Sequence, residues 1–178
     1  MTLKFALIGV GALVVGIAVS SFTVLEGGDE TSSSDEESVV TVGEPVVLHD
    51  VSYTVTGVRT AKRMFAVEHP TEFDEPRQTS GAFIAADVAL RNDGDEPVSA
   101  SFHGSSLVGG NGQTYSLDSL SWGTYYALQP GLGERGRLVF DVPPSATSDA
   151  ILVLANCPLD DAGEPAYCVD ARVDLGLR

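Results

Sequence analysis

Residues 81–98, GAFIAADVALRNDGDEPV, decide the fold class of this chain. Apolar side chains occupy every second position and so mark one face of a strand: Ala82, Ile84, Ala86, Val88 and Leu90. This period of two is typical of a half-buried β-strand. Residues 92–94, Asn-Asp-Gly, follow at once and tolerate positive φ, so they predict a turn that ends the strand.

The rest of the chain after residue 45 repeats this pattern of short strands and turns. Strands are predicted at 51–56, 107–108, 114–115, 136–142, 150–154 and 171–175. Gly, Pro, Asn and Asp separate these runs, and no segment beyond the N-terminus has a helical period. Residues 62–81 carry mixed charge and two prolines, which predicts a long loop. The spacing indicates an all-β fold, an antiparallel sandwich.

Three stretches resemble a widespread family of exported domains of unknown function, which are related in fold to telokin and to the mycobacterial immunoprotective extracellular antigen. These stretches are GAFIAADVALRNDGDEPV, LVGGNGQTY and LQPGLGERGRLVFDVPPSATSDAILVL. The positions that match the family pattern are Asn92, Pro130, Gly131, Gly136, Phe140, Asp141 and Pro143. The resemblance implies an immunoglobulin-like antiparallel β-sandwich on the outer face of a membrane. It implies no catalytic residues.

The N-terminus predicts a membrane segment, assigned to residues 1–25. Residues 5–25 contain no charge, Lys4 precedes them, and acidic residues come after them. At a rise of ~1.5 Å per residue such a helix spans a bilayer core of about 30 Å. A basic residue before the span and acids after it favour a single-pass protein with its C-terminal part outside the cell membrane. A cleaved signal peptide and secretion are the alternative.

Residues 26–44 are acidic and rich in Gly, Ser and Thr. Such a composition buries too little apolar surface to offset the entropy of ordering, so a flexible stalk is expected. The domain organisation predicted from the sequence is therefore an anchor or signal segment (1–25), a stalk (26–44) and an extracellular domain (45–178).

Charge limits the partners that this protein can have. The chain has 25 acidic and 10 basic residues and a net charge of −15. A polyanion is repelled by nucleic acid, so we expect no nucleic-acid partner. From residue 45 onward the net charge is still −9, with 18 acids and 9 bases, a balance typical of proteins from salt-loving microbes.

Two cysteines, Cys157 and Cys168, enclose a short acidic loop. In an exported domain a pair this close predicts a disulfide, because that compartment is oxidising. Their spacing is not the CxxC of a redox site.

Acidic clusters are the candidates for a cation site. One set lies in the turn after residue 92 and comprises Asp93, Asp95 and Glu96; another lies between the cysteines and comprises Asp160, Asp161 and Glu164. Neither matches a full calcium loop. The three histidines, His49, His69 and His103, show no metal-binding spacing, and no cofactor is predicted.

Motifs for catalysis are missing from the sequence, which has no GxSxG or SxxK pattern, so we expect no enzyme. The densest aromatic group is Trp122, Tyr125 and Tyr126, and rings exposed together there would form a binding surface. The sequence therefore favours a membrane-anchored, non-catalytic interaction or cell-envelope module whose partner is an extracellular protein or envelope component. An extracytoplasmic domain that binds a small ligand or divalent cation is the alternative.

The charge balance yields a testable prediction. Repulsion among surface acids is screened within about 3 Å in molar salt, so the melting temperature of the protein should rise between dilute and molar NaCl. Thermal unfolding followed by circular dichroism measures it. A melting temperature that does not change would contradict this interpretation of the surface charge.

Overall fold

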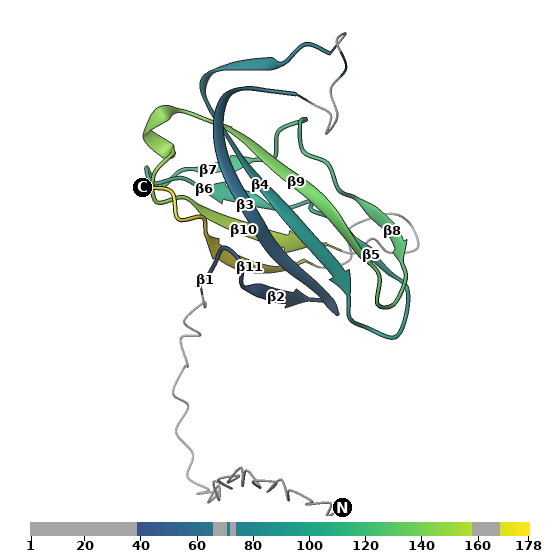
Figure 1. Ribbon diagram of the computed structural model, residues 1–178. Helices are drawn as coiled ribbons and strands as arrows, with labels where there is room; N and C mark the ends of the chain where they lie inside the picture. Colours follow the sequence, from purple (N-terminus) through teal and green to yellow (C-terminus); the bar gives the residue numbers. More distant parts are fainter. Residues whose placement is uncertain (1–38, 66–70, 72–73, 158–167) are drawn as a thin grey trace, which may run out of the picture. The chain divides into compact units, whose positions relative to one another are not determined.

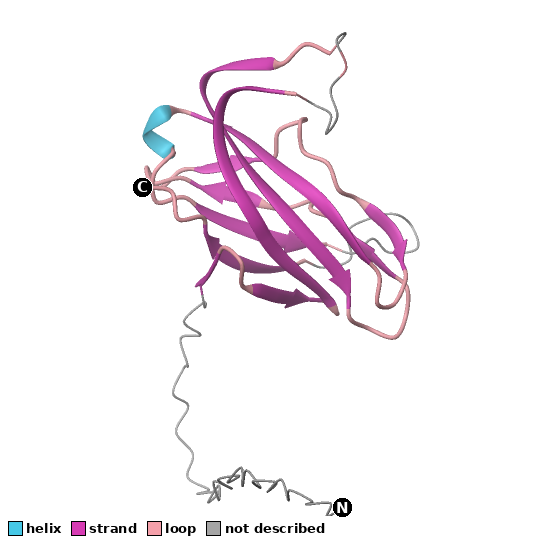
Figure 2. Ribbon diagram, in the orientation of Figure 1, coloured by secondary structure: helices cyan, strands magenta, loops and turns pink. Residues whose placement is uncertain are grey.

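The computed structural model describes residues 39–65, 71, 74–157 and 168–178; of Tyr126 it describes the backbone only. In this part of the chain it has eleven strands and a single 3₁₀ turn (Figure 2). They are β1 (Val39–Thr41), β2 (Pro45–Leu48), β3 (Val51–Met64), β4 (Arg77–Asn92), β5 (Val98–Ala100), β6 (Ser106–Val108), β7 (Thr114–Ser116), β8 (Tyr125–Leu128), β9 (Gly133–Val142), η1 (Pro144–Ala146), β10 (Ile151–Asn156) and β11 (Val169–Asp174).

Two larger sheets pack face to face (Figure 1). The first has the strand order β1-β11-β10-β6-β7, and the second has the order β2-β3-β4-β9; β5 and β8 form a separate pair. All pairs are antiparallel except β1 with β11. The prediction of an all-β sandwich is confirmed.

The predicted strands are present, and β3 and β4 extend furthest beyond the predicted bounds. β3 continues to Met64 and β4 begins at Arg77, so both ends of the segment predicted as a long loop (62–81) are strand. That expectation was wrong for these ends because Arg and Lys side chains on an exposed hairpin hide its period of two. β1 pairs with β11 from Val39 onward, so the folded part begins inside the segment predicted as stalk.

Strand β4 is buried on both faces. Ile84, Ala86, Val88 and Leu90 face the main core between the sheets, as the sequence predicts. On the other face, Phe83 and Ala85 are also fully buried, in a second core with Met64, Leu120 and Val139. The chain before Trp122 folds over this outer face and brings Leu120 onto it. The sequence did not predict the second core, because its members come from four distant segments.

Asn92 ends β4 with a fully buried amide. Its Nδ2 donates to the carbonyls of Glu96 and Leu128, each at 2.8 Å, and its Oδ1 accepts from the Gly94 amide at 2.9 Å. Its backbone amide donates to the Leu132 carbonyl, and its carbonyl accepts from the Gly131 amide. One residue therefore joins the end of β4 to the following turn, to β8 and to the turn before β9.

Position 136 of β9 has room only for glycine, because an aromatic ring packs against it. A Cβ at this position would lie 2.3 Å from Cε2 of Phe102, a buried ring of the main core. A Cβ at Gly123, where φ is +120°, would lie 2.7 Å from the same atom. Phe102 thus lies against two glycines, and any larger residue at either position would displace it.

Among the described residues no helix has the length and apolarity to cross a bilayer. The anchor or signal segment predicted at residues 1–25 lies outside the described residues. So do residues 26–38 of the predicted stalk.

The Asn92 junction makes the first structural prediction. Replacing Asn92 by Ala leaves two carbonyls and one amide without their partner, so the free energy of unfolding should fall by about 2–4 kcal/mol. Urea unfolding measures this loss. Asn111, which is exposed in the β6–β7 turn, is a matched control, and N111A should cost less than about 0.5 kcal/mol. Equal losses in the two variants would contradict the role given to Asn92.

Tyr53 provides a second prediction. Its side chain is 1% exposed and lies edge-on to Phe102, and among the described residues its hydroxyl has no hydrogen-bond partner. Replacement by Phe removes this desolvated hydroxyl, so the stability of Y53F should rise by about 1 kcal/mol. A loss of stability would show that the hydroxyl has a partner.

The same residue predicts a pH dependence. Burial raises the pKa of the Tyr53 phenol. The phenol therefore stays neutral in the folded protein while it ionises in the unfolded chain above about pH 10, so stability falls as the pH rises past that value. The fall should be smaller in Y53F. Chemical unfolding at pH 8 and pH 11 compares the two proteins, and equal falls would contradict the assignment.

Candidate binding surface around Trp122

The aromatic residues singled out by the sequence lie beside the outer edge of β9. Trp122 and Tyr125 are both partly buried and line one hollow together. Nothing is described of the Tyr126 side chain. Two of the three predicted aromatic residues therefore share a surface.

Trp122 is positioned by a short β-bridge. Trp122 and Arg137 exchange two backbone hydrogen bonds, each of 2.9 Å, along the edge of β9 that faces away from β4. One residue earlier, the Ser121 hydroxyl accepts from the Val139 amide at 2.8 Å and donates to its carbonyl at 3.2 Å. The pairing ends at Gly123, where the positive φ turns the chain away from β9.

A row of three side chains crosses the outer face of the second sheet at this level. Asp87 of β4 lies directly opposite Arg137 of β9 in the register, and Trp122 lies opposite Arg137 on the other side. Arg137 Nε lies 2.6 Å from Asp87 Oδ1, and Arg137 Cζ lies 5.8 Å from the centre of the indole ring. The guanidinium is held by a charged hydrogen bond and a cation–π contact, so it fixes one side of the ring.

Three hollows meet at Trp122. The smallest, about 80 Å³, is lined by Trp122, Phe102, Leu117 and Leu138 among others. A second, of about 180 Å³, is lined by Thr56, Asp87, Arg135 and Arg137. The largest, of about 440 Å³, is lined by Ala89, Leu90, Tyr125 and residues 133–135. We call this area the Trp122 surface; it combines apolar walls with a few charged groups, as ligand sites do.

His103 and Ser121 both line the smallest hollow, which is the pairing that nucleophilic catalysis would need. The Ser121 hydroxyl is already bonded to the backbone of Val139 on both its donor and acceptor sides. Its role in the structure is to hold the 118–122 segment on β9.

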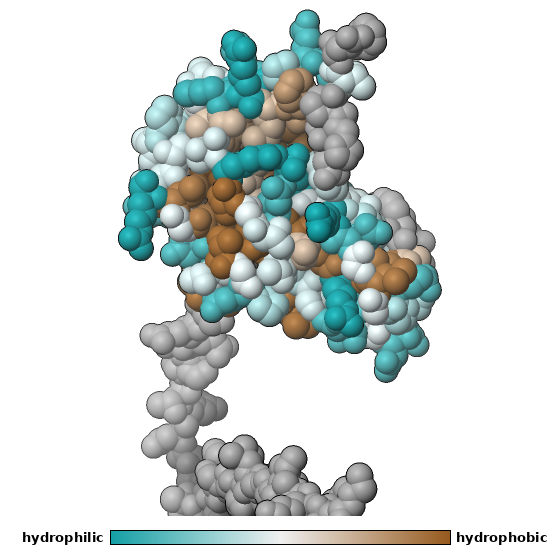
Figure 3. Space-filling model, in the orientation of Figure 1, coloured by the Kyte–Doolittle hydropathy of each residue, from teal (hydrophilic) through white to brown (hydrophobic). Residues whose placement is uncertain are grey.

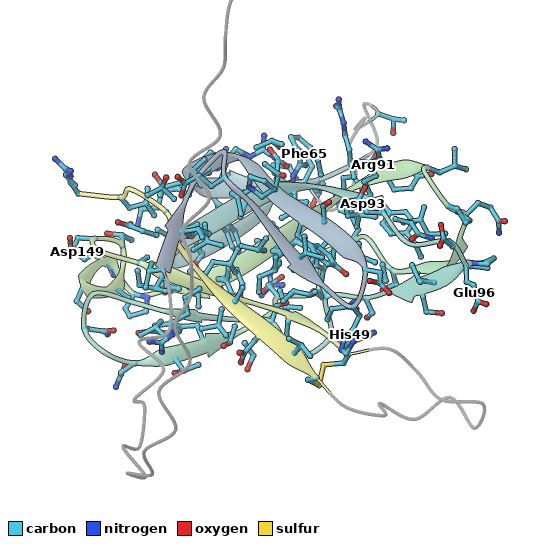
Figure 4. The ribbon with its side chains drawn as sticks, turned by 90° about the horizontal axis from the view of Figure 1, so that it is seen from below. His49, Phe65, Arg91, Asp93, Glu96 and Asp149 are labelled. Atoms are coloured by element: carbon cyan, nitrogen blue, oxygen red, sulfur yellow. A yellow bond between two sulfur atoms is a disulfide. The ribbon has the colours of Figure 1, made fainter. Side chains whose placement is uncertain are left out.

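The acidic turn after Asn92 does not converge on one point. Asp93 accepts a hydrogen bond from the Ser52 hydroxyl, and its Oδ1 lies 3.2 Å from Arg91 Nε. Figure 4 shows Asp93 beside Arg91, whereas Glu96 lies away from both. Asp95 is exposed. Among the described residues no group of three His, Cys, Asp or Glu side chains is placed to hold a metal ion. The second acidic set, Asp160, Asp161 and Glu164, lies outside the described residues, as does His69.

The predicted disulfide is confirmed: Cys157 and Cys168 are bonded. Cys157 is buried next to the end of β10, and a Cβ on Gly104 would lie 3.0 Å from its sulfur. The bond therefore ties the end of β10 to the start of β11. His49 lies at the same end of the sandwich in Figure 4.

The charged members of the Trp122 surface were not found from the sequence. Asp87, Arg135 and Arg137 lie on two strands 48 to 50 positions apart, and only the β4–β9 register brings them together. The alternation of Arg135 and Arg137 on either side of Gly136 is the signal that could have placed both arginines on one face.

Comparison with known proteins places the chain in a family. Residues 40–161 match the family described as a domain of unknown function (DUF4352). No curated protein matches the chain.

Solved structures confirm the type of fold. The chain is similar to the YjhA protein of Bacillus subtilis, with 16% identity and a TM-score of 0.54 over 77% of this chain and 99% of that one. It is also similar to a functionally unknown protein of Listeria monocytogenes, with 11% identity and a TM-score of 0.50 over 76% of this chain and 82% of that one. The specific relation to telokin and to the mycobacterial antigen stays a prediction. Because the family match covers more than half of its residues, this chain belongs to the DUF4352 family.

Proposed function

We propose that this protein is a non-catalytic binding module, displayed outside the cell membrane by its N-terminal apolar segment, and that the Trp122 surface contacts its partner. One observation carries the proposal: Trp122, the single tryptophan of the chain, borders three adjoining hollows while Arg137 and Asp87 hold its ring in place. Tryptophan, tyrosine and arginine are the residues most enriched at the centres of interfaces. A ring fixed before binding loses little entropy when a partner arrives.

Two features support display outside the cell. The uncharged N-terminal run has a basic residue before it and acids after it, which favours export of the C-terminal part of the chain. The Cys157–Cys168 bond suits an oxidising compartment. Secretion after cleavage of the N-terminal segment would place the domain on the same side. In this proposal the sandwich is of the immunoglobulin-like type and serves as a rigid support for the surface.

Exposed apolar side chains elsewhere allow a matched comparison. On the face shown in Figure 3, apolar residues form patches that hydrophilic side chains separate. Among the described residues Val47 of β2 is the most exposed large apolar one, at 64%, and it lies at the opposite edge of the second sheet from β9. Val47 therefore serves as the control position, which tests whether any exposed apolar residue would be crosslinked to a partner.

Site-specific photocrosslinking in intact cells tests the proposal. A photoreactive amino acid at Thr124, which is exposed beside Trp122, should yield a discrete crosslinked species, and the same group at Val47 should not. Replacing Trp122 by Ala should reduce the Thr124 crosslink at least tenfold, which corresponds to about 1.4 kcal/mol. The variant's melting temperature is measured alongside, and A89R, which fills the largest hollow without removing the ring, is a second variant that should have the same effect.

Equal crosslinking from Thr124 and Val47, or a Thr124 crosslink that survives both W122A and A89R, would contradict the proposal. Protease added to intact cells tests display separately. An epitope tag fused to the C-terminus should be removed from intact cells, and full protection of the tag until the cells are lysed would contradict export.

A further inference from the structure

Basic residues are concentrated on one sheet of this acidic protein. Of the ten Lys and Arg residues in the chain, seven lie on β3, β4 and β9: Arg59, Lys62, Arg63, Arg77, Arg91, Arg135 and Arg137. The same strands carry three acids: Asp87, Glu134 and Asp141. The second sheet is therefore a positive region in a chain whose net charge is −15.

The register shows which cations face outward next to the Trp122 surface. Arg135 lies opposite Ala89, and Ala89 is two residues from Asp87, so both are on the outer face with Arg137. Arg59 lies opposite Ala85, a member of the outer core, and so has the same orientation. Arg77, Arg91 and Arg137 have carboxylate partners, whereas among the described residues Arg59 and Arg135 form no ion pair. Arg59 lies on β3, which β4 separates from β9, whereas Arg135 lines the Trp122 surface, so one exposed cation remains at this surface to meet a negative group.

The outer edge of β9 has one unpaired stretch. β9 is an edge strand, and the bridge to Trp122 shows that Arg137 points its backbone amide and carbonyl away from β4. By alternation Val139 and Arg135 do the same. Segment 118–122 bonds to Arg137 and Val139, and it ends at Gly123, before it reaches Arg135. No backbone partner for Arg135 on this side occurs among the described residues.

The largest hollow lies beside that stretch. It is bordered by residues 133–135 of β9, by Ala89 and Leu90 of β4, and by Trp122 and Tyr125. Leu132, at the start of the stretch, is 57% exposed. An unpaired strand edge, two aromatic walls and an unpaired cation therefore meet at one place.

We infer that this edge receives an extended acidic peptide, which adds a short strand beside Gly133–Arg135. In strand addition the main-chain hydrogen bonds supply affinity, and pockets for alternate side chains supply specificity. Here the peptide backbone bonds to the outward amide and carbonyl of Arg135. One side chain, an apolar one, enters the hollow that Trp122 and Tyr125 line, and an acidic side chain on the outer face meets Arg135. This inference rests on the proposed function and names the class of its partner.

Synthetic peptides and the full-length chain test the inference. The probe is a decapeptide of alternating Glu and Val, and the comparison peptides are its Lys-Val counterpart and a Glu-Val version with alternate amides N-methylated. Binding is followed by the fluorescence of Trp122, the single tryptophan, and by calorimetry. The Glu-Val peptide should bind at least tenfold more tightly than the Lys-Val peptide, because of charge, and than the N-methylated peptide, because of the lost strand hydrogen bonds.

Two charge variants localise the contact. R135E should weaken Glu-Val binding at least tenfold. R178E makes the same change in net charge at an exposed residue that borders a different hollow, away from the Trp122 surface. It should change binding less than twofold. A Glu-Val peptide that binds no better than the Lys-Val peptide, binds equally well when N-methylated, or responds equally to R135E and R178E would overturn the inference.

These results are distinguishable from failure of the proposed function. If the Thr124 crosslink depends on Trp122 but the Glu-Val peptide does not bind, the binding module stands and the acidic peptide is wrong. If the crosslink does not depend on Trp122, both are wrong.

Discussion

The buried side chain of Asn92 is the contact on which the arrangement of the Trp122 surface depends. A primary amide desolvated inside a protein is costly unless its donors and acceptor are bonded, and here both donors and the acceptor have backbone partners. Its own backbone bonds to Gly131 and Leu132. Because those partners belong to the turn after β4, to the last residue of β8 and to the turn before β9, one residue holds the end of β8 and the start of β9 against the end of β4.

That placement creates the surface. β9 enters the sheet directly opposite β4, which puts Arg137 against Asp87, and β8 leaves Tyr125 facing the first residues of β9. Phe102 then lies against Gly136 and Gly123, so the chain can approach β9 only as far as Trp122 before it turns away. The hollow beside Gly133–Arg135 is the space left by that turn. Packing and hydrogen bonding thus leave the outer edge of β9 unpaired at Gly133–Arg135. A longer pairing between the Trp122 segment and β9 would have covered it.

Much of the fold could be predicted from the sequence because its signals are local. The alternation from Ala82 to Leu90, the turn at 92–94 and the prolines after Val142 each act within a few residues, and all three lie where the sequence places them. The disulfide was also predictable from the short spacing of the two cysteines and from the export that the N-terminal run predicts. The match to the family covers the same stretches, so local pattern and family agree.

The binding surface could be predicted only in part, because it depends on register. Trp122 and Tyr125 stood out as an aromatic cluster, but nothing local says that Arg137 holds the indole ring or that Asp87 holds Arg137. The outer core around Phe83 was missed for the same reason, since Leu120 and Met64 reach it from separate segments. The role of Asn92 was visible only as a turn residue, although its side chain and backbone together bond to three segments.

Amide hydrogen exchange of the unmodified full-length chain tests the central claim most directly. Turn amides ordinarily exchange through local opening, well before the core. If the Asn92 junction organises this end of the sandwich, the amides of Gly94 and Gly131 should exchange only as slowly as those of β4 and β9, in the same cooperative unfolding. Exchange of both amides at the rate of an exposed loop, while β4 and β9 stay protected, would show that the junction does not hold these segments together.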